Sequence, residues 1–127
     1  MSSVANEGLE VCTQILLLAT IRQSRLLGDF LIDVYRGQLR RLESTLNIRD
    51  WDVFLHECEQ RDPTVQNWTA NTRAKMLQVI LRILTEAAYL ESGRSLKMTP
   101  PLLHPRVRAY LANHKDHYAR EAMEHKQ

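Results

Sequence analysis

The 127-residue sequence predicts a single, mainly α-helical domain with four to five helices. Three observations support this fold class. Glycine and proline are scarce, at four residues each, so few turns are expected. Apolar residues make up 44% of the chain, which is typical of a soluble globular protein. These apolar residues recur at helical spacing in several long segments, and we therefore expect helices packed around one core.

Two helices are predicted in the N-terminal part of the domain, residues 7–43. The first runs from Glu7 to about Gln23 and is apolar on two sides. A domain of this size covers one side easily, so the second side predicts self-association or a protein partner. One side carries Leu9, Cys12, Leu16, Ala19 and Thr20, and the other carries Val11, Ile15, Leu18 and Ile21. The second helix runs from Arg25 to about Leu42, with a bend or an early end near Gly37.

The second part of the domain, residues 50–118, is predicted to begin with a short helix followed by a long one. Asp50 is predicted to cap a helix over residues 51–60, which the pair Asp62-Pro63 ends. Residues 64–68 form a short link, and Thr69 caps a second helix that reaches about Leu90. The apolar spacing predicts one core that joins the two helices. Its members are Trp51, Phe54, Trp68, Ile80 and Leu84.

A winged helix-turn-helix-like arrangement follows from the segment after the long helix. Gly93 offers a turn, and residues 89–90 and 96–98 are predicted to pair as the short strands of a β-hairpin wing. A short helix, a turn, a longer helix and a basic wing together form this motif. A last helix is predicted to open at His104 or Pro105, and the polar tail from Glu121 to Gln127 is predicted to fray.

The strongest candidate for a binding site is a polar stripe on the long helix. Asn and Gln can pair with adenine edges, while Arg and Lys bind guanine or phosphate. Two basic residues of the wing would reach the nucleic-acid backbone. The candidate nucleic-acid-binding residues are Asn71, Arg73, Lys75, Gln78, Arg82, Arg94 and Lys97. Every amphipathic helix also turns a polar stripe toward water, so helical spacing alone leaves a purely structural interpretation open.

Other chemistries lack a matching pattern in the sequence. His114 and His117 lie three residues apart, and His56 lies two residues from Cys58, but zinc requires three or four ligands. No nucleophile motif or phosphate loop is present, so we expect neither an enzyme nor a cofactor. The two cysteines are expected to be reduced, buried thiols. The apolar run 15–19 is too short to span a bilayer, and we place the protein in the cytoplasm, away from membranes.

The order of several short segments resembles the BrxA-like proteins of bacteriophage-exclusion (BREX) defence systems. The resemblance covers roughly residues 12–111, and it depends on the order and spacing of the segments rather than on any one motif. The similar segments are Leu16–Ala19, Arg22–Leu27, Asp29-Phe30, Asp50-Trp51, Phe54-Leu55, Trp68–Lys75, Leu81–Leu90 and Thr99–Leu103. Family members are usually longer at the N-terminus, so this chain looks like a C-terminal portion or a shortened relative.

The resemblance implies a small helical protein with winged-helix elements that binds double-stranded DNA and works beside other subunits of an anti-phage system. We therefore expect a non-catalytic DNA-binding accessory subunit. Two alternatives stay open. One is a helical protein–protein adaptor, and the other is an RNA-binding protein similar to the antitermination factor NusB, to which the family has been likened.

Overall fold

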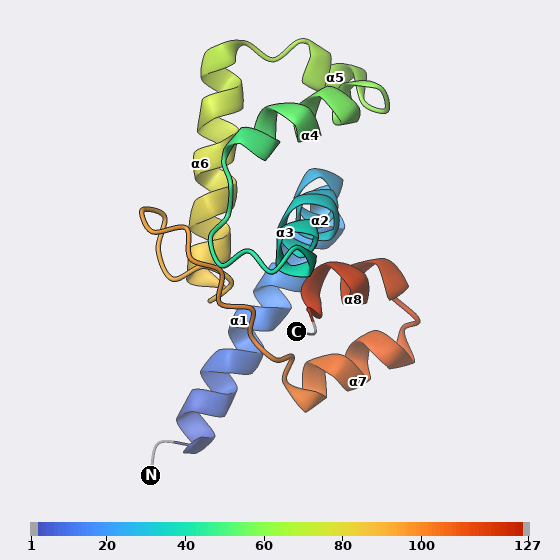
Figure 1. Ribbon diagram of the computed structural model, residues 1–127. Coiled ribbons are helices and arrows are strands. Elements are labelled where there is room, and N and C mark those ends of the chain that lie inside the picture. The colour runs from blue at the N-terminus through green and yellow to red at the C-terminus, as the bar shows by residue number, and fades with distance from the viewer. Residues whose placement is uncertain (1–2, 126–127) are drawn as a thin grey trace.

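The computed structural model describes the backbone of residues 3–125 and the side chains of residues 8–125. This part of the chain is helical apart from its connections, which confirms the predicted mainly α-helical class (Figure 1). A short π-helical segment, η1, interrupts one helix. The elements are α1 (Ser3–Gln23), α2 (Arg25–Phe30), η1 (Leu31–Tyr35), α3 (Arg36–Arg40), α4 (Arg49–Glu59), α5 (Pro63–Gln66), α6 (Ala70–Glu86), α7 (Pro105–Asn113) and α8 (His117–Met123).

Helix α1 buries the C-terminal part of one apolar side and leaves the other side open, while Ile15 of the first side stays 38% exposed. Leu17, Leu18 and Ile21 lie in the core, whereas Leu9 and Leu16 are 68% and 63% exposed. The N-terminal half of α1 projects beyond the other helices in Figure 1. The helix is fastened at mid-length by Gln14, whose side-chain amide donates to the carbonyl oxygen of Leu102 (3.2 Å) and accepts from the backbone N–H of His104 (2.8 Å).

The predicted second helix is observed as the continuous run α2–η1–α3. Its irregularity is the π-helical turn at Leu31–Tyr35, which lies just before Gly37 rather than at it. A π-turn inserts one extra residue into a helix and so changes the direction in which the following side chains point. The helix ends after Arg40, and Leu42 takes a left-handed conformation with a φ of 61°.

The structure differs from the predicted helices in two places around α4. Asp50 is not the N-cap, because α4 begins at Arg49 and places Asp50 in the first turn. Asp62 ends the preceding helix as predicted, but it also caps the next one by accepting from the backbone N–H of Thr64 (3.0 Å). With proline in the first turn after it, this cap starts the short helix α5 where the sequence predicted only a link.

The predicted β-hairpin wing is wrong, and with it the winged helix-turn-helix arrangement. Helix α6 ends at Glu86, and no strand forms in the part of the chain that the structure describes. The flanks of the loop pair only through isolated bridges, Leu90 with Met98 and Thr45 with Lys97. Ala88 and Leu96 have positive φ angles, 69° and 55°, and such residues break the extended geometry that a continuous ladder needs.

The predicted last helix is two helices, and its tail is packed rather than frayed as far as the structure describes it. The break lies at Lys115, which has a φ of 52°. Ala119, Ala122 and Met123 of α8 are fully buried, and His125 is 6% exposed. The spacing of these three residues, i, i+3 and i+4, is that of a helix with one buried face. The predicted fraying of residues 126–127 lies outside the described residues.

The core contains most of the residues that the sequence predicted for it. Trp51, Phe54, Ile80 and Leu84 are buried, while Trp68 is only partly buried and packs against the same cluster. The ring of Phe30 from α2 lies edge-on to those of Trp51 (5.9 Å) and Phe54 (5.6 Å), and so joins α2 to α4.

The two cysteines differ, although both were expected to be buried. Cys58 is buried in α4, whereas Cys12 is exposed on the open side of α1. Burial raises the pKa of the Cys58 thiol, so this side chain behaves as a small apolar residue of the core.

Candidate nucleic-acid interface

The polar stripe of α6 faces solvent along the whole length of the helix. Thr69 starts the helix by accepting a hydrogen bond from the backbone N–H of Thr72 (3.1 Å). Ile80, Leu81 and Leu84 bury the opposite face. This packing leaves the predicted stripe exposed: Asn71, Lys75, Gln78 and Arg82.

The two cations of this stripe form no ion pair within the described part of the chain. Neither Lys75 nor Arg82 pairs with a carboxylate among the residues that the structure describes. Many of the other arginines do form such pairs, for example Arg22 with Asp116 (2.9 Å). A cation without an internal partner can neutralise a ligand anion without first breaking a contact. Lys75 and Arg82 are therefore better placed to bind phosphate than the ion-paired arginines.

Arg73 lies apart from the stripe and holds α6 against α4. Its guanidinium forms an ion pair with Glu59, and its backbone carbonyl oxygen accepts a hydrogen bond from the indole N–H of Trp51 (3.1 Å). The side chain is partly buried. Arg73 therefore links α6 to α4, and its predicted contact with nucleic acid stays a prediction.

Arg94 and Lys97 lie on the loop that follows α6, and hydrogen bonds hold this loop in place. The backbone N–H of Glu91 donates to the carbonyl oxygen of Lys97 (2.9 Å), and the hydroxyl group of Ser92 accepts from the N–H of Ser95 (3.0 Å). Both basic side chains are exposed. Lys97 lies 3.9 Å from the carboxylate of Glu91, a solvent-exposed pair that contributes little stability.

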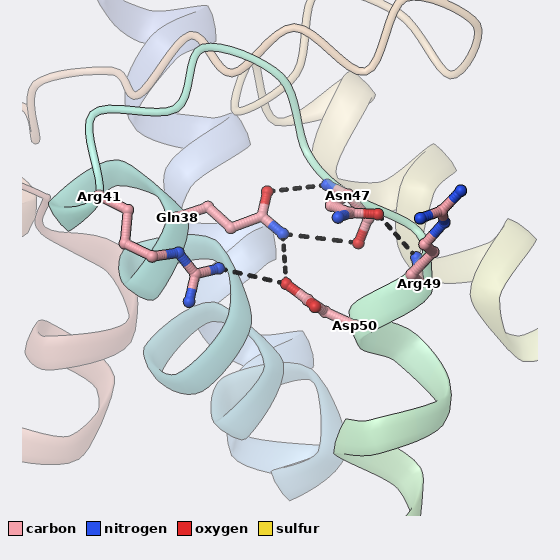
Figure 2. A network of polar contacts seen from close by, with 5 residues as sticks. All are labelled: Gln38, Arg41, Asn47, Arg49 and Asp50. Carbon is pink, nitrogen blue, oxygen red and sulfur yellow. Dashed lines mark hydrogen bonds and ion pairs between the residues drawn. The ribbon is translucent and has the colours of Figure 1, made fainter.

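A hydrogen-bonded network fixes the chain between α3 and α4, and the sequence analysis did not find it (Figure 2). The buried amide of Gln38 donates to the carboxylate of Asp50 (2.6 Å), and its oxygen accepts from the backbone N–H of Asn47 (2.8 Å). Arg41 also reaches the Asp50 carboxylate (3.3 Å). The amide of Gln38 is satisfied by Asn47 and Asp50, so this network holds the 41–49 connection.

A groove of about 800 Å³ lies between α3 and α8 and was also missed, because the tail was predicted to fray. Leu39 and the 91%-exposed Leu42 contribute its apolar part. Positive and negative side chains balance around it, and Arg36 pairs with Glu121 (2.8 Å) across it. The signal available in the sequence was the apolar spacing of Ala119, Ala122 and Met123, which predicts that α8 packs.

No metal site is formed by the candidate ligands in the described part of the chain. No group of three His, Cys, Asp or Glu side chains comes together there. The ring of His114 stacks on that of Tyr110 (4.0 Å between centroids), and His56 is exposed while Cys58 is buried. Within the same described residues, no helix is both long and apolar enough to cross a bilayer.

Comparison with known proteins gives the family. The family model described as BrxA matches residues 1–115 of this chain. The chain belongs to the BrxA family. This membership confirms the resemblance seen in the order of the sequence segments.

The curated relatives are longer than this chain. It is 32% identical over 109 residues to the BREX protein BrxA of Paramagnetospirillum magneticum, which covers 86% of this chain and 55% of that protein. It is 28% identical over 102 residues to the BREX protein BrxA of Bacillus cereus, covering 80% of this chain and 51% of that protein. The chain thus spans about half the length of these BrxA relatives.

A solved structure shares the fold of most of this chain. The structure is similar to the crystal structure of a protein from Magnetospirillum magneticum, with a TM-score of 0.83 and 31% sequence identity. The similarity covers 91% of this chain and 60% of that one.

Proposed function

We propose that this BrxA-family chain is a DNA-binding accessory subunit of a bacteriophage-exclusion defence system, with no catalytic step of its own. The relatives are named as BREX proteins, which supports the defence system and makes its other subunits the expected protein partners. The observation that carries the DNA-binding part is the stripe of α6, on which Lys75 and Arg82 are exposed and form no ion pair with the residues that the structure describes.

The dimensions of the stripe suit a duplex. Lys75 and Arg82 are seven residues apart, which is about 10 Å along a helix at 1.5 Å per residue. That distance corresponds to about three base pairs at 3.4 Å each. Asn71 and Gln78 lie on the same stripe and carry the amide groups that pair with adenine edges. The stripe therefore combines phosphate-binding cations with base-reading amides.

Arg94 and Lys97 would add contacts to the flanking phosphates. Their loop is joined to the end of α6, where the hydroxyl group of Thr99 donates to the carbonyl oxygen of Ala88 (2.9 Å). An anchored loop loses less conformational freedom on binding than a free one. We assign Arg73 the role of holding α6 against α4.

The test is the salt dependence of binding to duplex DNA. Fluorescence anisotropy of a labelled oligonucleotide measures the binding. Four phosphate contacts, from Lys75, Arg82, Arg94 and Lys97, should give a slope of about −3.6 for log K against log salt concentration. Single-stranded RNA and double-stranded RNA serve as competitors. Preferential competition by RNA would favour the NusB-like alternative, and absence of duplex binding at 50 mM salt would contradict the proposal.

A second candidate is the helical adaptor, and the open side of α1 favours it. Leu9 and Leu16 are mostly exposed there, and large apolar side chains gathered on one open helix face are typical of protein–protein contact. An adaptor would bind another subunit of the defence system through α1 and would show no duplex binding at low salt. The same anisotropy titration therefore separates the two candidates.

A further inference from the structure

We propose that the groove between α3 and α8 binds the carboxyl-terminal end of a peptide from a protein partner, with Arg40 holding the terminal carboxylate. This groove is a different surface from the stripe of α6, and peptide binding there is independent of DNA binding. Three properties of the groove support this assignment: its volume, the lining groups that have no internal partner, and the chemistry that those groups share.

The groove has the dimensions of a ligand site. Its volume of about 800 Å³ lies within the range of about 300–1,000 Å³ that is typical of ligand-binding pockets. Helices α3 and α8 form its two walls and lie beside each other in Figure 1. The ion pair between Arg36 and Glu121 (2.8 Å) joins the two walls and holds them together. A groove whose walls are fixed in this way is largely formed before a ligand enters.

Most of the arginines that line the groove already have a partner inside the protein. Arg36 pairs with Glu121, and Arg120 pairs with Glu124 (3.3 Å). Arg40 is the exception, because its side chain is exposed and forms no ion pair with the residues that the structure describes. Its guanidinium is therefore available to a carboxylate from outside, which an arginine can bind through two parallel hydrogen bonds.

The second group without a partner is a ring nitrogen of His125, which lines the groove and is only 6% exposed. Its Nε2 lies 2.7 Å from the carbonyl oxygen of Ala122, and a carbonyl group can only accept, so Nε2 carries the proton. Burial lowers the pKa of the ring to about 4, so the ring is neutral near pH 7 and Nδ1 is an acceptor. Within the described part of the chain, Nδ1 has no donor. Such buried acceptors are rare in folded proteins, and an N–H group of a ligand would satisfy this one.

Two leucines supply an apolar surface in the same groove. Leu39 is half-buried and packs against the core, whereas Leu42 is 91% exposed. Covering an apolar side chain that lies almost wholly in solvent is favourable because its surface leaves water. The groove therefore favours a ligand with an apolar side chain.

The last residue of a peptide carries all three of the required groups. Its carboxylate, its backbone N–H and its side chain branch from one Cα atom. One residue can thus offer an anion to Arg40, a donor to His125 and an apolar group to the leucines.

The carboxylates of the groove favour a peptide over a nucleic acid. Glu43, Glu121 and Glu124 line the groove and would repel a chain of phosphates. Glu43 forms no ion pair within the described part of the chain, so it is available to a basic side chain. We therefore expect a peptide that ends in an apolar residue and has a lysine or arginine shortly before it.

Fluorescence anisotropy of a labelled peptide tests the site. The probe is the tetrapeptide Lys-Ala-Leu-Leu with fluorescein on its amino terminus and a free carboxyl terminus. The same peptide with a carboxyl-terminal amide should bind about tenfold more weakly, because it lacks the charge-assisted contact. A third probe, methylated on the nitrogen of its last residue, lacks the N–H group for His125. It should bind about three- to tenfold more weakly than the first, the range expected for one neutral hydrogen bond.

Arg40→Ala tests where the carboxylate binds. This variant should bind the free acid about tenfold more weakly than the wild-type chain does and should bind the acid and the amide equally. Arg106→Ala on α7 removes another exposed arginine, outside the groove, and should leave both affinities unchanged. Both arginines lie in solvent, so the circular dichroism spectrum of neither variant should change.

Several results would overturn the peptide site. They are no binding of the free acid at about 1 mM protein, equal binding of acid and amide by the wild-type chain, and full affinity in Arg40→Ala. Displacement of the probe by duplex DNA would make the groove part of a nucleic-acid surface instead. An N-methylated probe that binds as well as the first would overturn the contact with His125. Duplex binding by α6 is measured in a separate titration, so failure of either proposal is seen independently of the other.

Discussion

The hydroxyl group of Tyr89, just after α6, donates a hydrogen bond to the backbone carbonyl oxygen of Met123 near the end of the chain, at 2.5 Å. The carbonyl oxygen of Tyr89 in turn accepts from the hydroxyl group of Tyr35 (2.6 Å). Both tyrosines are fully buried. This relay connects the π-turn η1, the end of α6 and the end of α8, which are three segments distant in sequence.

Replacing Tyr89 with phenylalanine should destabilise the protein by about 1–3 kcal/mol, because the buried carbonyl group of Met123 then loses its donor. Urea unfolding followed by circular dichroism measures this change. Tyr110→Phe is the control. The Tyr110 hydroxyl group accepts from exposed Arg22 at 3.3 Å, and its loss should cost about 0.5 kcal/mol or less. Equal losses for the two variants would contradict the role of the relay.

Two glycines on the second helix should respond in opposite directions to alanine. A Cβ atom at Gly28 would overlap the hydroxyl group and ring of Tyr118, while nothing lies within 4 Å of one at Gly37. Gly28→Ala should therefore destabilise the protein by about 1–3 kcal/mol through overpacking. Gly37→Ala should stabilise it by up to about 1 kcal/mol through helix propensity. The difference in urea midpoint between the two variants is the measurement.

Removing Lys75 and Arg82 together should weaken duplex binding and flatten the salt slope by about two units, since each lost phosphate contact removes about one. The anisotropy titration of the double alanine variant measures both. A matched control, Arg106→Ala with Lys115→Ala, removes the same charge from two exposed positions outside the stripe. If the control loses affinity and the Lys75/Arg82 variant keeps it, the interface lies elsewhere than on α6.

Arg73→Ala should act on stability and leave the salt slope nearly unchanged. The guanidinium pairs with Glu59 and is only partly exposed, so its loss leaves a partly buried carboxylate without its cation. The expected cost is about 1–3 kcal/mol of unfolding free energy. A flattening of the slope by a full unit, with stability unchanged, would instead make Arg73 a phosphate contact.

The stability of the fold should fall as the pH falls from about 6.5 toward 4. Burial against Tyr35 and Tyr89 lowers the pKa of His125 to about 4, below its ordinary value of 6.5. Between these two pH values the unfolded chain binds a proton at His125 and the folded chain does not. The stabilisation is therefore fully present above pH 6.5 and is lost as the pH falls. The loss should approach about 3 kcal/mol at pH 4, since one pKa unit corresponds to about 1.4 kcal/mol.

Urea midpoints between pH 7 and pH 4 measure this dependence, and His125→Phe is the comparison. That variant lacks the titrating ring and should show a flatter profile than the wild-type chain over this range. If His125→Phe shows the same pH dependence of the urea midpoint as the wild-type chain, His125 is not the group responsible.

Several features of this protein follow from sequence alone because they depend on local periodicity and composition. The helix that Thr69 caps, the exposed stripe from Asn71 to Arg82, and the buried Trp51 and Phe54 all reflect the repeat of apolar residues along one helix. The order and spacing of short segments also sufficed to predict the BrxA family, which the family model confirms over residues 1–115.

Other features were decided by contacts between segments that are distant in sequence. The predicted wing fails because Ala88 and Leu96 adopt positive φ angles where the loop joins α6 and residues 44–46, which local propensity does not report. The sequence offered Arg73 as a candidate contact in the first turn of α6, and only the fold shows that its guanidinium pairs with Glu59 of α4. The tail looked polar, yet the buried end of α8 meets Tyr89. Which side of α1 stays open was likewise settled by packing, because both sides are apolar and the core has room to cover just one.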